Sequence, residues 1–324
     1  MTLRSVVIGV GSYLPEQIVT NADLEKRVDT TDAWIVERTG IKQRHIAADG
    51  ELTSHLGAKA ALDALAKAGL KATDIDLLLV ATTTPDDTMP STATKIQHQI
   101  GMTQGAAFDI SAACSGFVYA MMTADSYIRS GNAKRVLVVC AETYSRILDW
   151  SDRTTCILFG DGAAALVLES AEGKGDISDR GILFNRIYSD GQYHGILNTS
   201  GGVSSTQSAG FLFMAGKEVF RHAVAKMADV VEEGLNALGI TADKVSWIIP
   251  HQANSRILQG VAKRLGVAEN QVIMTVDRHA NTSAASIPLA LAVASSEGRI
   301  KQGQLLVLPA LGAGLTWGAC ILRW

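Results

Sequence analysis

The two halves of this 324-residue chain repeat one another. Residues 69–80, GLKATDIDLLLV, align with residues 239–250, GITADKVSWIIP, and each segment has the pattern of a helix end, a loop and a buried strand. Residues 135–140 match residues 304–309 in the same way, at an offset of about 169 residues against 170 for the first pair. Because the register is nearly constant, we predict that one αβ unit has been duplicated.

Each copy contains near-continuous apolar strands separated by helical segments, a pattern typical of parallel sheets that helices cover on both faces. We therefore expect an α/β fold in which two mixed, mostly parallel sheets pack around shared helices. The two halves are expected at residues 1–170 and 171–324, with residues 171–212, rich in Gly, Ser and Asp, as a connecting excursion. A hydrophobic content of 47% is sufficient for a large core.

The charge and the cysteines exclude several classes of function. The formal net charge is -3 and no basic run occurs, so neither nucleic acid nor an anionic membrane is an expected partner. The four cysteines form no metal-ligand spacing, which predicts reduced thiols in the cytoplasm and no bound metal. Residues 3–10 have the pattern of a strand rather than a signal peptide, and no apolar stretch approaches the length of a membrane span.

Cys114 lies where a nucleophile would be placed, in the small-residue run SAACSG between an apolar strand at 106–110 and a helix that Gly131 ends. The N–H groups and the dipole of a helix N-terminus favour an anion, so we expect more thiolate than in an unperturbed cysteine. A single cysteine is nevertheless more often a small buried hydrophobe. The residues that the fold brings near Cys114 distinguish between these two interpretations.

The repeat places two further side chains near Cys114. A shift of 167 residues from Cys114 leads to Asn281, which is also expected to open a helix. His251 follows the apolar strand 245–249, at the carboxyl end where α/β sheets place their sites. Taken singly, Asn281 could be a helix cap and His251 a structural histidine. If a twofold axis relates the halves, however, all three side chains can meet at the centre.

These three residue types together indicate chemistry on thioesters. A thiolate can accept an acyl group, and two uncharged donors can stabilise an enolate as it forms, which permits carbon–carbon bond formation. A papain-like hydrolase also uses Cys, His and Asn, with the histidine as base. The repeat, and a glycine-rich loop at 309–318 whose N–H groups follow a strand end, favour the first interpretation.

Four motifs in order resemble those of β-ketoacyl-acyl-carrier-protein synthase III, a family of the thiolase-like fold. They are ACSG at 113–116, PHQAN at 250–254, RHANTSA at 278–284 and GAGLTWG at 312–318. The resemblance runs from end to end and includes WIVERTGI at 34–41. It implies a five-layered α-β-α-β-α architecture and a homodimeric acyltransferase without metal or redox cofactor.

The implied reaction starts type II fatty-acid synthesis. Acetyl-CoA, or another short acyl-CoA, condenses with malonyl-acyl carrier protein to give acetoacetyl-carrier, CoA and carbon dioxide. By resemblance, Cys114 is the acylated nucleophile, while His251 and Asn281 donate hydrogen bonds to the malonyl thioester carbonyl. Backbone N–H groups of Cys114 and Ala313 would form the oxyanion hole. The family usually has glycine where Ala313 stands, but a backbone donor survives a methyl side chain if φ is negative.

The resemblance also implies three groups of binding residues. The CoA contacts are Trp34 and Arg153 around the adenine, and Arg38, Thr39 and Asn254 at the phosphates and pantetheine. The acyl pocket comprises Met89 from the partner subunit with Phe159, Leu197 and Phe220, which favours short primers although a flexible Met can adapt to longer or branched ones. The carrier-protein contacts are Arg256, Lys263 and Arg264, for which ordinary surface charge is the alternative.

Other members of the fold match less well. Thiolases need a second cysteine where Ala310 and Leu311 stand, elongating synthases use two histidines, and hydroxymethylglutaryl-CoA synthases need an added glutamate. A secondary-metabolite ketosynthase making a polyketide or quinolone is the main alternative, and a non-catalytic acyl-CoA-binding protein is a remote one. Gly9-Val10-Gly11 is not a dinucleotide fingerprint, because no third glycine follows at the required spacing.

Overall fold

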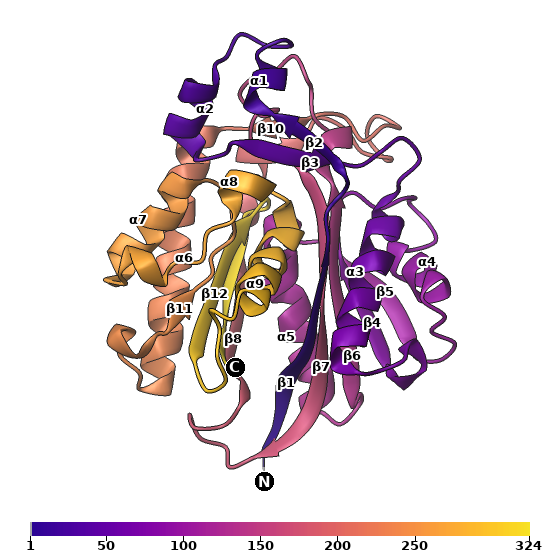
Figure 1. Ribbon diagram of the computed structural model, residues 1–324, viewed down its shortest axis with the longest axis vertical. Coiled ribbons are helices and arrows are strands. Elements are labelled where there is room, and N and C mark those ends of the chain that lie inside the picture. The colour runs from indigo at the N-terminus through magenta and orange to yellow at the C-terminus, as the bar shows by residue number, and fades with distance from the viewer. Residues whose placement is uncertain (1) are drawn as a thin grey trace.

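The structure, a computed structural model, describes residues 2–324 and contains two main sheets (Figure 1). The first sheet has the order β1-β7-β6-β4-β5 and the second has the order β11-β12-β13-β8. The strands of the first sheet are β1 (Thr2–Tyr13), β4 (Leu77–Ala81), β5 (Ala106–Ile110), β6 (Arg135–Thr143) and β7 (Asp161–Gly173). Those of the second are β8 (Gly181–Ser189), β11 (Trp247–Ile248), β12 (Leu305–Gly312) and β13 (Thr316–Arg323). Two small pairs join β2 (Gln17–Thr20) to β3 (Gln43–Ile46), and β9 (Leu197–Thr199) to β10 (Leu212–Met214).

The helices form three layers that alternate with the two sheets (Figure 1). The central layer consists of α5 (Gly116–Arg129) and α9 (Ser286–Ser296). The outer face of the first sheet is covered by α3 (Thr53–Ala68) and α4 (Thr92–Gln99), and that of the second by α6 (Gly216–Leu238) and α7 (Ser255–Leu265). Three short helices lie at one end, α1 (Asn21–Leu24), α2 (Asp32–Thr39) and α8 (Val276–His279). This arrangement confirms the predicted five-layered α/β fold.

The central helix α9 explains why the two halves form one body. Its residues are apolar on every side and nearly all buried, which is the pattern of a helix enclosed by other elements. Residues from both sheets, from α5 and from α9 belong to one continuous hydrophobic core. The starts of α5 and α9 are therefore held side by side, at the level where the strands of both sheets end. No helix in residues 2–324 is long and apolar enough to cross a membrane.

The sheets are mixed, as expected, but less parallel than expected. Only the pairs β4–β5, β4–β6 and β11–β12 are parallel among the described strands of the two sheets. The pairs β1–β7, β6–β7, β12–β13 and β13–β8 are antiparallel. The reason is plain for β12 and β13, since the connection at residues 313–315 is far too short for a crossover.

The expected boundary and connecting excursion also need correction. Strand β7 runs to Gly173, so the first half ends beyond residue 170. The segment 171–212 is not a mere connection, because β8 pairs with β13 at the edge of the second sheet. Buried Ile182, Leu183 and Phe184 anchor that strand, and β9 and β10 form a small ribbon beside the cavity described below. Its Gly-, Ser- and Asp-rich composition concealed these short apolar strands.

Gly11 allows β1 to pass close to α3, which is a structural role for one of the glycines at 9–11. A Cβ at Gly11 would lie 2.2 Å from the Ala64 backbone nitrogen and 2.3 Å from the Ala60 carbonyl oxygen. We expect Gly11→Ala to lower the free energy of unfolding by about 3 kcal/mol, because backbone atoms of the helix must move. Urea unfolding measures this change.

Gly191→Ala is the matched control for that prediction. A Cβ at Gly191 meets nothing within 4 Å, so the free energy of unfolding should change by less than about 0.5 kcal/mol. Equal unfolding midpoints for the two variants would show that β1 and α3 can separate without cost.

Candidate active site

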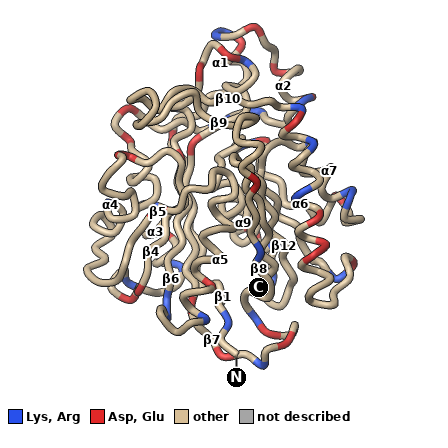
Figure 2. Tube along the Cα trace, turned by 180° about the vertical axis from the view of Figure 1, so that it is seen from behind, with Lys and Arg blue, Asp and Glu red and all other residues tan. Residues whose placement is uncertain are grey.

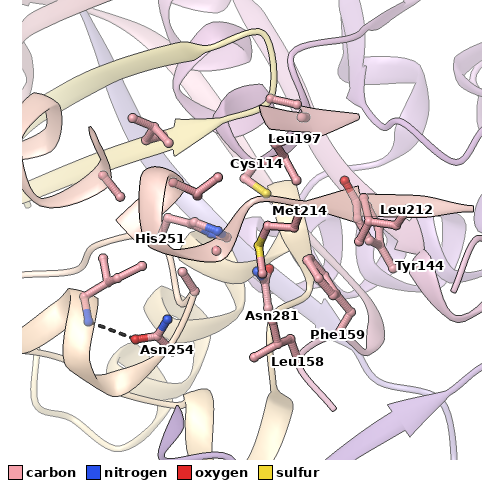
Figure 3. Close-up of a pocket in the computed structure, with 18 of the residues that line it drawn as sticks. Cys114, Tyr144, Leu158, Phe159, Leu197, Leu212, Met214, His251, Asn254 and Asn281 are labelled. Carbon is pink, nitrogen blue, oxygen red and sulfur yellow. Dashed lines mark hydrogen bonds between the residues drawn. The ribbon is translucent and has the colours of Figure 1, made fainter. Parts of the chain in front are cut away.

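Cys114, His251 and Asn281 line one cavity of about 250 Å³, and their side chains converge in it (Figure 3). Cys114 lies in the 3-10 turn η2 (Ala113–Ser115) that leads into α5, and His251 follows β11. Asn281 lies between α8 and the 3-10 turn η7 (Ser283–Ala285) that leads into α9. The three residues are 5%, 3% and 5% exposed, so the site is nearly closed to solvent in a single chain.

The turns before α5 and α9 are copies of each other, but their register differs from the expected one. Ala113 and Ser283 both have positive φ, 47° and 50°, and Ser283 lies 170 residues after Ala113. At this offset the counterpart of Cys114 is Ala284, not Asn281. The shift of 167 residues was therefore wrong as a structural equivalence, although the duplication itself holds.

Asn281 reaches the cavity because its backbone pairs with a neighbouring segment. Its N–H donates to the Leu158 carbonyl at 2.9 Å, and its own carbonyl accepts from the Gly160 N–H at 3.0 Å. The side-chain oxygen Oδ1 accepts from the Ser283 backbone N–H at 2.8 Å. A backbone N–H has to meet the oxygen of an amide, so this contact fixes the orientation of the group. The Nδ2 donor is consequently left for a ligand.

His251 is held as a neutral ring. Its backbone N–H donates to the Pro309 carbonyl at 2.9 Å. This hydrogen bond attaches the loop that follows β11 to the neighbouring strand β12. Burial lowers the pKa of the imidazole to about 3. At neutral pH the ring can therefore offer a hydrogen bond to a ligand without carrying a charge.

Burial works against the thiolate that was expected at Cys114. Burial raises the pKa of the Cys114 thiol to about 12, an effect that the Ser283 hydroxyl opposes and the Glu142 carboxylate reinforces. The desolvation cost of a buried anion thus outweighs the helix N-terminus. The thiol proton has to leave during the reaction, because the anion is scarce before a substrate enters.

This raised pKa predicts how Cys114 reacts in the free protein. Below a thiol's pKa, the thiolate fraction increases about tenfold for each pH unit. We expect the rate of alkylation of Cys114 by iodoacetamide, followed by intact mass, to rise at that slope between about pH 7 and pH 9. A rate that levels off near neutral pH would show that the helix N-terminus dominates instead.

The turn between β12 and β13 lies directly against the backbone of Cys114. A Cβ at Gly312 would be 2.7 Å from the Cys114 nitrogen, so only glycine fits at this approach. The Thr316 hydroxyl lies 3.0 Å from the carbonyls of both Ala112 and Ala313, which ties the turn to η2. Ala313 lines the cavity and is not among the described residues with positive φ, so its methyl group is compatible with the turn.

Glu142 is a buried neighbour of the site that the sequence did not reveal. Its carboxylate accepts from the Thr84 hydroxyl at 2.7 Å and from the Thr83 N–H at 3.0 Å. Burial raises the pKa of Glu142. Thr83 also reaches the Tyr144 hydroxyl at 3.1 Å, and both of these residues line the cavity. A glutamate inside the apolar strand β6 carries no spacing signal that would connect it with Cys114.

The rest of the cavity is apolar. Phe159, Leu197 and Phe220 line it, as the acyl-pocket expectation requires, whereas Met89 does not and is 82% exposed in the single chain. The sequence missed several other lining residues, namely Ile147, Leu158, Leu212, Met214, Val219 and Met227. The Tyr144 and Phe159 rings are stacked with their centroids 5.0 Å apart. The space around Cys114 therefore suits a short hydrocarbon chain.

A second, more open cavity adjoins the first and contains four of the five expected CoA contacts, Trp34, Arg38, Thr39 and Asn254. The fifth contact, Arg153, has its guanidinium 5.3 Å from the centroid of the Trp34 ring. Among the described residues, Arg153 forms an ion pair only with Asp29. Asn254 lines both cavities and caps α7 through the Ile257 N–H at 3.0 Å (Figure 3). The open cavity therefore lies next to the one that contains Cys114.

Thr39 is less available to a ligand than expected. Its hydroxyl donates to the Ile35 carbonyl at 2.7 Å and accepts from the Ile41 N–H at 3.0 Å. The proton that a phosphate would need is thus used to end α2. Within residues 2–324, no group of three or more His, Cys, Asp or Glu side chains is placed to hold a metal ion.

The expected carrier-protein residues lie on α7, where Figure 2 marks basic positions in blue. Arg256 donates to the Glu37 carbonyl at 3.1 Å, and Arg264 is paired with Asp229. Lys263 has no ion pair with the described residues. Two of the three cations are thus already engaged with this chain.

Residues 108–191 match the family 3-oxoacyl-[acyl-carrier-protein] synthase III, and residues 235–324 match the C-terminal region of the same family. The β-ketoacyl-[acyl-carrier-protein] synthase III of Allorhizobium ampelinum is 59% identical over 322 residues, covering 99% of this chain and 100% of that protein. The corresponding protein of Rhizobium rhizogenes is also 59% identical, with the same coverage.

Solved structures agree with these relatives. A 3-oxoacyl-[acyl-carrier-protein] synthase III from Aquifex aeolicus superposes with a TM-score of 0.92 at 45% identity, covering 99% of this chain and 100% of the other. A priming β-ketosynthase from a polyketide biosynthetic pathway gives a TM-score of 0.91 at 36% identity, covering 99% and 96%. The same fold therefore occurs in a 3-oxoacyl-[acyl-carrier-protein] synthase III and in a priming β-ketosynthase of polyketide biosynthesis.

Proposed function

Because this chain belongs to the 3-oxoacyl-[acyl-carrier-protein] synthase III family, we propose that it transfers a short acyl group from CoA to malonyl on acyl carrier protein. Members of this family are acyltransferases that catalyse a condensation. The observation that supports the proposal most is the convergence of a thiol, an imidazole and a carboxamide from separate elements in one apolar cavity. The reaction then has two half-steps that use different groups.

In the first half-step Cys114 takes the acyl group. Its sulfur attacks the thioester carbonyl, a sulfur–carbon bond forms, and the bond to the CoA sulfur breaks. The proton of the Cys114 thiol leaves with the CoA thiolate, so charge balances. The carbonyl oxygen becomes an oxyanion in the transition state, where the backbone N–H groups of Cys114 and Ala313 would stabilise it.

In the second half-step the malonyl thioester loses carbon dioxide. Its carbonyl oxygen would lie between His251 Nε2 and Asn281 Nδ2, and the electron pair of the broken carbon–carbon bond moves onto this oxygen as an enolate. Two neutral donors suit the step, since each binds the anion more strongly than the ground-state carbonyl. The enolate carbon then attacks the acyl group on Cys114, and the thiolate leaves as the new carbon–carbon bond forms.

The open cavity supports CoA binding beside Trp34. Its ring has the Arg38 guanidinium 4.7 Å from its centroid and the Arg153 guanidinium at 5.3 Å. A ring stacked between two planes needs about 3.5 Å on each side, so an adenine enters only if Arg153 swings outward. Arg153 is half-exposed and donates to the carbonyl and carboxylate of Asp29, so it has to give up these exposed contacts when it swings outward. The Lys263 side of α7 would receive the acidic carrier protein.

A homodimer is part of the proposal. Strand β5 is the edge of the first sheet and is only partly buried, which leaves a hydrogen-bonding edge available to another strand. Met89 is a large apolar side chain at 82% exposure and would be covered by a partner. Sedimentation equilibrium of the intact protein tests this, and a monomer at micromolar concentration would contradict it. The four free cysteines fit a reducing cytoplasm.

The primer is the property that a panel of acyl-CoAs decides. With malonyl-carrier as the second substrate, we expect acetyl-CoA and other short primers to be condensed fastest, because the cavity has a volume of only about 250 Å³ and the stacked rings of Tyr144 and Phe159 line it. The measurement is the rate of β-ketoacyl-carrier formation for each primer. The 36% identity with a polyketide priming synthase supports one alternative. A preference for an aromatic primer, or for malonyl-CoA over malonyl-carrier, would favour that alternative.

A further inference from the structure

Ser286 is a buried neighbour of His251 that no motif singled out. It is the first residue of α9 and is 2% exposed. Its Oγ lies 2.7 Å from His251 Nδ1 and 3.2 Å from the backbone nitrogen of Gln252. Both contacts lie on the side of the imidazole that faces away from Nε2.

The number of protons at Ser286 determines the direction of these contacts. The Gln252 N–H can only donate, so it occupies one lone pair of Oγ. The hydroxyl has one proton of its own, and His251 Nδ1 is the only other polar atom recorded within hydrogen-bond distance of Oγ among residues 2–324. If Nδ1 carried the ring proton, the serine proton would have no acceptor at a buried position.

We propose that Ser286 donates its proton to His251 Nδ1 and so fixes the tautomer in which Nε2 carries the ring proton. Ser286 is thus a positioning residue, and the inference rests on the proposed role of His251. With this tautomer, Nε2–H meets the enolate oxygen as a donor. The other tautomer would present a lone pair to an anion and would repel it.

The surrounding loop keeps the ring in place while Ser286 sets its proton. The Gln252 side-chain amide donates to the Pro250 carbonyl at 2.8 Å and to the Ile273 carbonyl at 3.1 Å. Its oxygen accepts from the Thr275 N–H at 2.8 Å. The loop on both sides of His251 is therefore rigid, so Ser286 has no need to hold the ring in position by itself.

The segment that leads into α9 accordingly orients both hydrogen-bond donors of the site. Asn281 presents Nδ2 because the Ser283 N–H occupies Oδ1, and His251 presents Nε2–H because the Ser286 hydroxyl occupies Nδ1. One short segment, residues 281–286, would set the polarity of two side chains that come from different parts of the chain.

Nitrogen NMR of the intact protein labelled with 15N-histidine tests the tautomer directly. His251 is assigned from the signals lost in His251→Gln. We expect the wild-type ring to show an unprotonated Nδ1 and a protonated Nε2, constant over neutral pH. A protonated Nδ1 in the wild-type protein overturns the inference, and this result needs no active variant.

Kinetics of the two half-steps give the second test. In Ser286→Ala, malonyl-carrier decarboxylation should fall about tenfold, while acetylation of Cys114 by acetyl-CoA stays within about twofold. Ser286→Cys, which keeps a weak donor, should recover part of the loss. Unchanged decarboxylation in a folded Ser286→Ala protein overturns the inference, and so does an equal loss of both half-steps.

His251→Ala separates this inference from the proposed function. If His251→Ala keeps full decarboxylation, the proposed role of His251 is wrong, whatever the tautomer. If His251→Ala loses decarboxylation and Ser286→Ala does not, His251 keeps its role and only the inference on Ser286 is overturned. Thermal unfolding of each variant shows that a change in rate is not a change in folding.

Discussion

Cys114→Ala is expected to take up no acetyl group from acetyl-CoA and to form no condensation product. Cys114 is the only cysteine among the described residues that line the cavity, so its removal takes away the thiol that would accept the acyl group. Intact mass after incubation with acetyl-CoA measures the adduct. Decarboxylation of malonyl-carrier should persist in this variant, because His251 and Asn281 remain in place, and the released enolate would then be protonated.

Cys320→Ala is the matched control for that experiment. Cys320 is fully buried in β13 and its thiol does not line the cavity, so this variant should become acetylated like the wild type. An adduct on Cys114→Ala, or the loss of acetylation in folded Cys320→Ala, would refute the assignment of the nucleophile. Peptide mapping of the wild-type adduct locates the acyl group independently.

Asn281→Ala is expected to slow malonyl-carrier decarboxylation by about 100-fold to 1,000-fold, the usual cost of losing one donor to a developing oxyanion. Acetylation of Cys114 should change little, because the oxyanion formed in that step meets backbone donors instead. Carbon dioxide release and acetyl uptake, measured separately, give the two rates. Equal losses in both would show that Asn281 acts on the shape of the site rather than on the enolate.

Asn281→Asp makes this prediction sharper. An aspartate has the same shape and can still accept from the Ser283 N–H, as Oδ1 of Asn281 does at 2.8 Å. It replaces the Nδ2 donor by an oxygen, however, and places a negative charge beside the enolate. Decarboxylation should therefore fall at least as far as in Asn281→Ala. Near-normal decarboxylation in Asn281→Asp would contradict the role of the amide as a donor.

The repeat and the strand ends were sufficient to predict much of this fold. Two sheets around shared helices follow from apolar strands and helix stops that recur at a fixed offset, and β4 with β11 and β6 with β12 obey it. His251 was found because the end of a parallel strand is a general position for sites. These features depend on local pattern and register, which a sequence displays directly.

The features that the sequence did not reveal depend on tertiary packing. The raised pKa of Cys114 results from burial by η7 and the β12–β13 turn, neither of which is near it in sequence. Strand β8 was hidden because its apolar residues lie among glycine, serine and aspartate. The counterpart of Cys114 was misplaced by three residues because the backbone turns at Ala113 and Ser283, not the side chains, keep the repeat.

The turn at Ala313 against Cys114 also has a consequence for the order in which a new chain becomes active. During synthesis the nucleophile emerges about 200 residues before the turn that closes its cavity. A chain made to residue 250 therefore holds the thiol but not the imidazole or the carboxamide, and a chain made to residue 312 still lacks the backbone donor of Ala313. The chain would be able to take an acyl group from CoA only after β12 and β13 have paired. Unfinished chains would therefore not consume acyl-CoA.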